Sequence, residues 1–193
     1  TGHPAGAADL LPDLIAWENE AAGYMHDGQV RCVAGCQSSL PTNVYRFSVA
    51  IPNIGDGVFE LREETDAEDT QIVYQRIYDS QGGEPREEVI GIFEDVDPDF
   101  GHLNLEGLAQ YNLRLVTPGG DAGALVSTND KTIHVFFVCV SFDTNLPGAP
   151  MFPFYTSIQG EILGISIGYA DLYPRNLQQQ WVPITGLPDG MYW

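Results

Sequence analysis

The chain has 193 residues, of which 44% are hydrophobic, so it can bury one substantial core and is expected to form a single domain. Its 27 acidic residues outnumber 8 basic ones, giving a formal net charge of -19 at pH 7. Such a charge repels phosphate backbones, so no nucleic acid partner is expected, and no stretch approaches the roughly 20 apolar residues of a membrane helix, so membrane insertion is not expected. The acidity is typical of a hydrated surface, with attraction of cations or basic partners as the alternative.

Residues 1–43 are expected to form an irregular segment packed on the domain, because proline and small residues interrupt any periodic pattern there. Within it, Cys32 and Cys36 are close enough in sequence for a disulfide bond across a small loop, which would indicate an oxidising compartment. The chain begins at Thr1 without a signal peptide's apolar run, as a processed mature product would. An extracellular or cell-surface location is therefore expected, with the periplasm as the alternative.

From residue 44 onward, apolar and polar residues alternate as in half-buried strands, with Tyr45, Phe47, Val49 and Ile51 on one face. Further strands are predicted at QIVYQRIY, EVIGIFE, LAQYNLRL, KTIHVFFVCVSF and QWVPI, with a hairpin tip at SQGGEPRE. No amphipathic helical pattern separates them. Residues 44–193 are therefore predicted to form an all-β, antiparallel β-sandwich domain.

The ordered block YADLYPRN followed by QWVPITGLPDGMYW, together with YRFSVAIPNIGDGVFELR and LEGLAQYNLRL, resembles the lysyl oxidase family, particularly its bacterial members. The resemblance runs in blocks from Leu11 to Trp193 and implies a lysyl-oxidase-like β-sandwich. That family's domain continues with another strand after the Pro-Asp-Gly turn. An open edge is therefore expected at the C-terminal end of this chain, where another chain could pair.

The resemblance also implies a copper site of alternating histidines just before LEGLAQYNL. Phe100, His102 and Asn104 fall on those positions, so His102 alone matches. Copper(II) in such sites needs several converging imidazoles, and His134, in a predicted strand, could supply a second. His102 and His134 are therefore the candidate copper ligands.

In that family a tyrosine and a lysine together form a quinone cofactor. Their positions correspond to Tyr173 and Val135 in this chain, so the tyrosine is present and the lysine is not. Lys131 is the only lysine of the chain and lies four positions before Val135 on the same face of the predicted strand. Tyr173 and Lys131 are the candidate catalytic residues if the chain is active. Cys139 corresponds to a cysteine of the family, but the region expected to supply its disulfide partner contains no cysteine in this chain. Cys139 is therefore expected to be a buried free thiol.

These substitutions predict an extracellular, catalytically inactive lysyl-oxidase-like scaffold, without a cofactor, that acts in protein assembly or surface attachment through protein partners or as a homo-oligomer. The alternative is a copper-dependent amine oxidase with a site rebuilt from these residues. A second alternative is a calcium-stabilised adhesion module, because the loops ETDAEDT and EDVDPDF present the carboxylates that calcium prefers.

Overall fold

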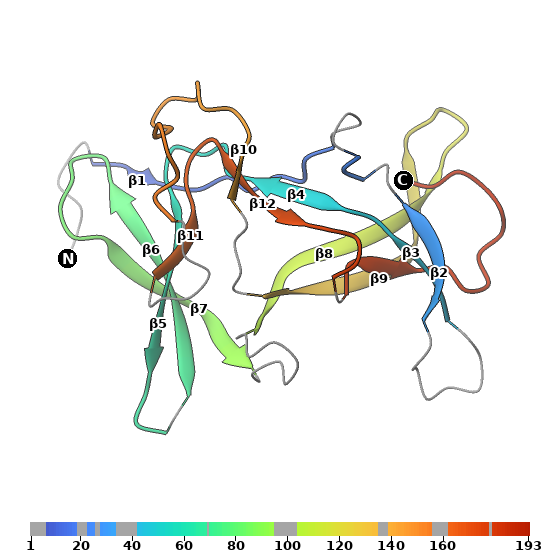
Figure 1. Ribbon diagram of the computed structural model, residues 1–193, viewed down its shortest axis with the longest axis horizontal. Coiled ribbons are helices and arrows are strands. Elements are labelled where there is room, and N and C mark those ends of the chain that lie inside the picture. The colour runs from blue at the N-terminus through green and yellow to red at the C-terminus, as the bar shows by residue number, and fades with distance from the viewer. Residues whose placement is uncertain are drawn as a thin grey trace. The chain divides into compact units, whose positions relative to one another are not determined.

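The computed structural model describes residues 7–18, 23–25, 28–33, 42–68, 70–94, 104–134, 139–155, 162–177 and 179–193. Over these ranges the fold is all-β and antiparallel, sandwich-like and without helices, as the sequence predicted. A helix able to cross a membrane is accordingly not found in the described ranges. The strands, labelled in Figure 1, are β1 (Asp9–Leu10), β2 (Gln29–Val33), β3 (Thr42–Arg46), β4 (Val49–Pro52), β5 (Phe59–Thr65), β6 (Gln71–Asp79), β7 (Arg86–Glu94), β8 (Asn104–Val116), β9 (Ala122–His134), β10 (Cys139–Ser141), β11 (Ile162–Ile165), β12 (Tyr169–Tyr173) and β13 (Trp181–Pro183).

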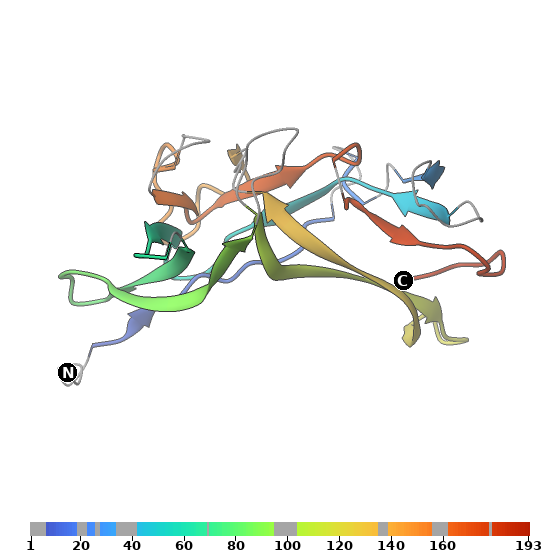
Figure 2. The same ribbon diagram turned by 90° about the horizontal axis from the view of Figure 1, so that it is seen from below.

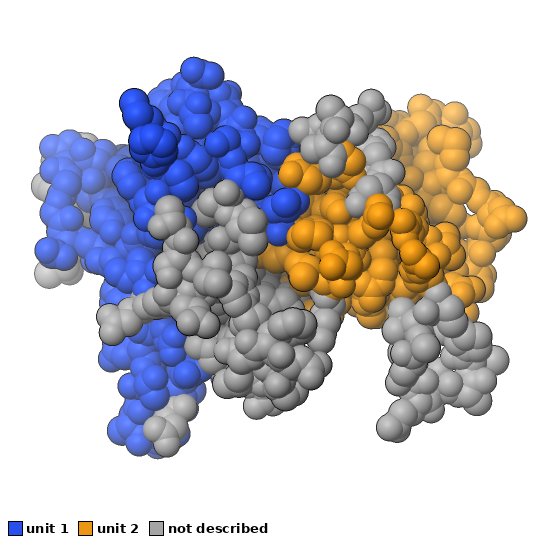
Figure 3. Space-filling view, viewed as in Figure 1, with its two compact units in different colours: residues 1–17, 50–106, 134–172 blue, residues 18–49, 107–133, 173–193 orange. Residues whose placement is uncertain are grey.

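The chain divides into two compact units, each built from three separate segments (Figure 3). Unit 1 comprises residues 1–17, 50–106 and 134–172, and unit 2 comprises residues 18–49, 107–133 and 173–193. Strands β4, β8, β9 and β12 continue from one unit into the other.

The main sheet of unit 1 joins β11, β5, β6 and β7 in that order, with β1 on β6 and the start of β8 on β7. Strands β6 and β7 confirm the predicted strands QIVYQRIY and EVIGIFE. The turn between them is the predicted hairpin tip, where Gly82 and Gly83 have φ angles of 81° and 110° that other residues adopt only with strain. The buried apolar side chains of this sheet are Phe59, Leu61, Val73, Ile77, Leu163 and Ile165.

A second, three-stranded sheet has the order β10, β12, β4. At its edge the backbone N–H of Trp17 donates to the carbonyl of Ala50, and the Trp17 ring packs edge-on against Phe142 with 4.8 Å between ring centroids. Asn53 directly follows β4 and is fully buried. These contacts hold the N-terminal segment of unit 1 against the sheet.

Unit 2 contains the sheet β13, β3, β2 and the long β8–β9 hairpin, whose ribbons are olive and gold in Figure 2. The hairpin turns at Thr117, whose N–H donates to the carbonyl of Asp121. Beyond β13, the backbones of Trp193 and Arg114 exchange two hydrogen bonds of 2.8 and 2.7 Å. The described C-terminal residues therefore pair on one side with β8 of their own chain, and pairing of this end with another chain stays a prediction.

Two further predictions differ from the structure. Residues 1–43, expected to be irregular, contain β1, β2 and the first residues of β3. The strand predicted across residues 44–51 is divided into β3 and β4, and all four residues from Phe47 to Ala50 are buried. Side chains on both faces of the chain are buried there. The alternation of apolar and polar residues therefore does not show where one strand ends and the next begins.

Candidate functional site

The candidate copper ligands lie at the limits of the described chain. Phe100, His102 and Val135 fall outside the described residues, and His134 and Asn104 are described as backbone positions of β9 and β8 only. Within the described ranges, no group of three or more His, Cys, Asp or Glu side chains could hold a metal ion. The copper assignment of His102 and His134 thus stays a prediction, as does the disulfide between Cys32 and Cys36.

The two candidate catalytic residues are brought together in unit 2. Lys131 on β9 is fully buried, and Tyr173 at the end of β12 is 2% exposed. The Nζ atom of Lys131 lies 5.2 Å from the centroid of the Tyr173 ring, within the range of a cation–π interaction. The only lysine of the chain therefore faces the tyrosine that the family resemblance singles out.

The segment that follows Tyr173 is fixed to the rest of unit 2 by side chains from two strands, β3 and β9. Arg46 on β3 donates to the carbonyls of Arg175 and Leu177 at 3.2 and 2.9 Å. Asn129, two positions before Lys131 on β9, donates to the carbonyl of Gln179 at 3.0 Å. These bonds hold the backbone after Tyr173 against β3 and against the part of β9 that precedes Lys131. The Lys131–Tyr173 contact therefore belongs to the packed interior of unit 2.

The first predicted calcium loop is organised by its own backbone. The Oδ1 atom of Asp66 accepts hydrogen bonds from the N–H groups of Glu68 and Thr70 at 2.8 and 2.9 Å, which lowers the pKa of Asp66. This carboxylate oxygen thus closes the turn between β5 and β6. Most of the second loop, EDVDPDF, lies outside the described residues.

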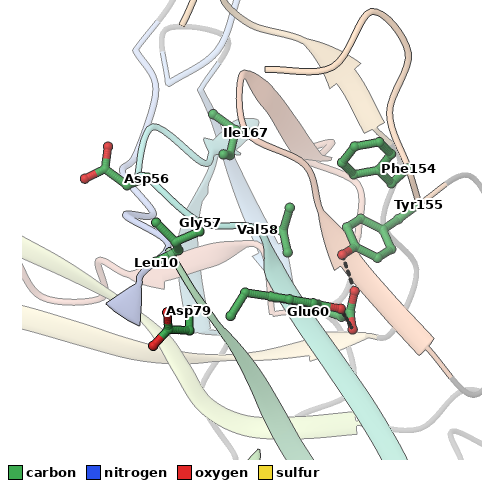
Figure 4. A pocket seen from close by; sticks show the side chains of 10 residues that line it. Leu10, Asp56, Gly57, Val58, Glu60, Asp79, Phe154, Tyr155 and Ile167 are labelled. Atoms are coloured by element: carbon green, nitrogen blue, oxygen red, sulfur yellow. Dashed lines mark hydrogen bonds between the residues drawn. The ribbon is translucent and has the colours of Figure 1, made fainter. Parts of the chain in front are cut away.

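A buried carboxylate that the sequence did not indicate lies in unit 1. Glu60 on β5 is 5% exposed, and its Oε1 atom accepts hydrogen bonds from Arg76 Nη1 at 2.5 Å and from the Tyr78 hydroxyl at 2.9 Å. The Tyr155 hydroxyl donates to the other oxygen, Oε2 (dashed in Figure 4). Arg76 compensates the buried charge, and the two hydroxyls satisfy the remaining acceptor sites.

The same face of the sheet carries a row of alternating charges. Glu87 on β7 accepts two hydrogen bonds from Arg62 on β5, at 2.6 and 2.7 Å, and its Oε1 atom lies 3.5 Å from Nε of Arg76. The bond from Arg62 lowers the pKa of Glu87. Both arginines are therefore engaged by carboxylates of their own sheet.

Above Glu60 lies an open hollow of about 470 Å³, within the size range of ligand pockets. It is lined mostly by apolar and aromatic side chains, with carboxylates at Asp56, Glu60 and Asp79 (Figure 4). The full set is Leu10, Asp56, Gly57, Val58, Glu60, Tyr78, Asp79, Phe154, Tyr155 and Ile167. Asp56 and Asp79 lie on the side opposite Phe154 and Tyr155 in this view.

The wall formed by Tyr155 is fixed in place. A side-chain carbon on Gly164 would lie 2.9 Å from the Tyr155 ring, so glycine leaves the space that the ring occupies. Burial and the hydrogen bond to Glu60 raise the pKa of Tyr155 well above its ordinary value of 10.0. The same two causes raise the pKa of Tyr78.

We expect the contribution of the Tyr155–Glu60 bond to the free energy of unfolding to decline in alkali. Tyr155→Phe should lower the free energy of unfolding by about 1.5–3 kcal/mol near neutral pH, since it removes a hydrogen bond to a charged group. Above the unfolded-state pKa near 10, only the unfolded wild type releases the tyrosine proton, so the wild-type advantage should shrink as pH rises. Urea unfolding of both proteins from about pH 8 to about pH 11 measures this. A difference that stays constant across the range would contradict it.

A scan against protein-family models and searches of curated proteins and of solved structures found no match to this chain. These comparisons therefore give no support to the resemblance to lysyl oxidases, which stays a prediction from the sequence blocks.

Proposed function

We propose that this chain is a lysyl-oxidase-like scaffold that works outside the cell, or at its surface, in protein assembly or attachment and does not oxidise amines. The observation that carries the proposal is an apolar loop in unit 1: Met151, Phe152 and Phe154 are 83%, 74% and 66% exposed. Large apolar side chains gathered on a surface mark interaction sites, because leaving them in water is unfavourable. Phe154 also lines the hollow above Glu60.

The sequence supports the absence of oxidase chemistry in this proposal. Phenylalanine at position 100 has no atom that can bind copper, and asparagine at position 104 is a poor ligand for it. Valine at position 135 provides no amine. The close cysteines Cys32 and Cys36 support an oxidising location.

Fractionation of cells from the native source tests this role. We expect the chain in the extracellular or surface-bound fraction, together with a protein partner, and released by high salt because screening weakens attachment through an acidic surface. A low-salt wash is the control. Recovery from the cell interior, or as a partnerless monomer at low salt, would contradict the proposal.

A copper-dependent amine oxidase is the second candidate, and the Lys131–Tyr173 contact favours it. A quinone would form by a bond between Nζ of Lys131 and a ring carbon of Tyr173, with molecular oxygen as the oxidant. The joined pair would gain one oxygen atom and lose four hydrogen atoms. His102 and His134 would be the copper ligands, and the described side chains do not complete a set of three.

Peroxide release separates the two candidates. The purified chain, supplied with copper and air, is mixed with n-butylamine and compared with Lys131→Met, which keeps the buried volume and lacks the amine. On the scaffold proposal, both proteins release peroxide at the same background rate. Turnover in the wild type that Lys131→Met abolishes would establish the oxidase instead.

A further inference from the structure

The hollow in unit 1 has an apolar interior and an acidic rim. Leu10, Val58, Ile167 and Phe154 supply its apolar surface, and Asp56 is exposed at its edge. A volume of about 470 Å³ exceeds that of a single large side chain, and the hollow is open to solvent. The site can therefore admit a side chain of a larger molecule together with part of its backbone.

Charge determines which partners can approach. Of the carboxylates that line the hollow, Glu60 pairs with Arg76, and Asp56 and Asp79 lie on the side opposite Phe154. Asp56 is exposed, and Asp79 accepts a hydrogen bond from the backbone N–H of Gln81 at 2.6 Å. The basic side chain nearest Glu60, Arg76, is held between Glu60 and Glu87. With a net charge of -19, the chain attracts cationic partners and repels a second copy of itself.

The hollow is already formed in the absence of a partner. The hydroxyl of Tyr155 is anchored on Glu60, and the backbone N–H of Gly57 donates to the carbonyl of Leu11 at 3.0 Å. A side-chain carbon on Gly57 would lie 2.1 Å from the carbonyl oxygen of Leu10, so glycine is required for this close approach. A site whose Tyr155 and Gly57 walls are already formed suits an anchoring side chain, because little ordering of these walls accompanies binding.

We propose that the hollow binds an apolar or aromatic side chain from a basic segment of a partner protein, with neighbouring lysine or arginine side chains facing Asp56 and Asp79. This inference rests on the proposed scaffold function and names the class of partner. The anchor contacts Phe154, while the flanking cations provide long-range attraction and specificity.

The probe is a fluorescein-labelled, end-blocked peptide, Arg-Lys-Phe-Lys-Arg, whose binding is followed by fluorescence polarisation. One control peptide replaces its phenylalanine with glycine, and another replaces its four basic residues with glutamate. We expect measurable binding of the basic peptide, about tenfold weaker binding of the glycine peptide and none of the acidic one. Raising the salt concentration should weaken binding.

Substitutions in the hollow, each with a matched control outside it, identify where the peptide binds. Phe154→Ala should weaken binding about tenfold, whereas Val89→Ala, at an apolar residue of β7 that is 63% exposed and does not line the hollow, should change it less than about twofold. Asp56→Asn should weaken binding about threefold and reduce its salt dependence, and the exposed control Glu68→Gln should not. Circular dichroism and thermal unfolding verify that each variant is folded.

The outcomes separate this inference from the scaffold function. Absence of peptide binding, or equal losses in Phe154→Ala and Val89→Ala, would overturn the hollow as the site while surface attachment could still be observed by fractionation. Self-association by light scattering that Phe154→Ala abolishes would assign the hollow to a second copy and overturn the basic partner. Peptide binding with the expected variant pattern, in a chain recovered without any partner, would support the site and contradict the scaffold function.

Discussion

Glu60→Ala should lower the free energy of unfolding by about 3–5 kcal/mol, because it removes one partner from a buried ion pair. Arg76, whose side chain is 18% exposed, would lose its bond to Glu60, and the hydroxyls of Tyr78 and Tyr155 would lose their acceptor. Tyr155 is also a wall of the hollow, so the same change should weaken peptide binding there. Urea unfolding measures the loss of stability.

A control for this prediction is available on the same strand and face. Glu64 pairs with Arg62 at 2.8 Å, but its side chain is 54% exposed. Glu64→Ala should therefore change the free energy of unfolding by less than about 1 kcal/mol. Equal effects of the two substitutions would show that burial of Glu60 does not determine its contribution.

Asn53→Ala should destabilise the chain by roughly 2–4 kcal/mol, since two buried backbone carbonyls and two part-buried N–H groups would each lose a partner. Asn53 is fully buried, and its Nδ2 donates to the carbonyls of Gly57 and Ile165 at 2.8 and 3.2 Å. Its Oδ1 accepts from the N–H groups of Asp13 and Gly55, both at 3.1 Å. One side chain thus joins the N-terminal segment, the turn after β4 and β11.

Two further variants sharpen the Asn53 prediction. Asn112→Ala removes an exposed asparagine from β8 and should shift the free energy of unfolding by less than about 0.5 kcal/mol. Asn53→Asp keeps the acceptor for Asp13 and Gly55 but removes both donors, so it should also be strongly destabilising. If the midpoint of urea-induced unfolding of Asn53→Ala were close to that of Asn112→Ala, the role assigned to Asn53 would be contradicted.

The strands that the sequence predicted best are β6 and β7, which are rich in β-branched and aromatic residues and are joined by a Gly-Gly turn. The strand-forming residues and the turn residues agree there, and both strands were placed to within two residues. The β8–β9 hairpin was predicted only in part, because residues 122–130 begin with small and apolar residues and continue with polar ones, which gives no clear alternation. Short strands such as β1 and β2 depend on partners distant in sequence, which local pattern does not reveal.

The functional residues were predictable to different degrees. Lys131 was identified as the only lysine, but its position about 13 Å along the strand from Val135 gave no indication that it meets Tyr173. That contact arises from packing between strands that are not neighbours in sequence. Glu60 was missed because alternation places it opposite Phe59 and Leu61, on the face expected to be exposed, and its burial depends on Tyr155, 95 residues away. The apolar run MFPFY in a loop was the one signal that could have indicated this site.

The measurement that tests the account most directly is a peptide mass map of the chain purified from its native source. The scaffold proposal predicts that Lys131 and Tyr173 are recovered in separate peptides with unmodified masses. A joined peptide that contains both residues, with one oxygen atom gained and four hydrogen atoms lost, would contradict the proposal and identify the buried pair as a quinone cofactor.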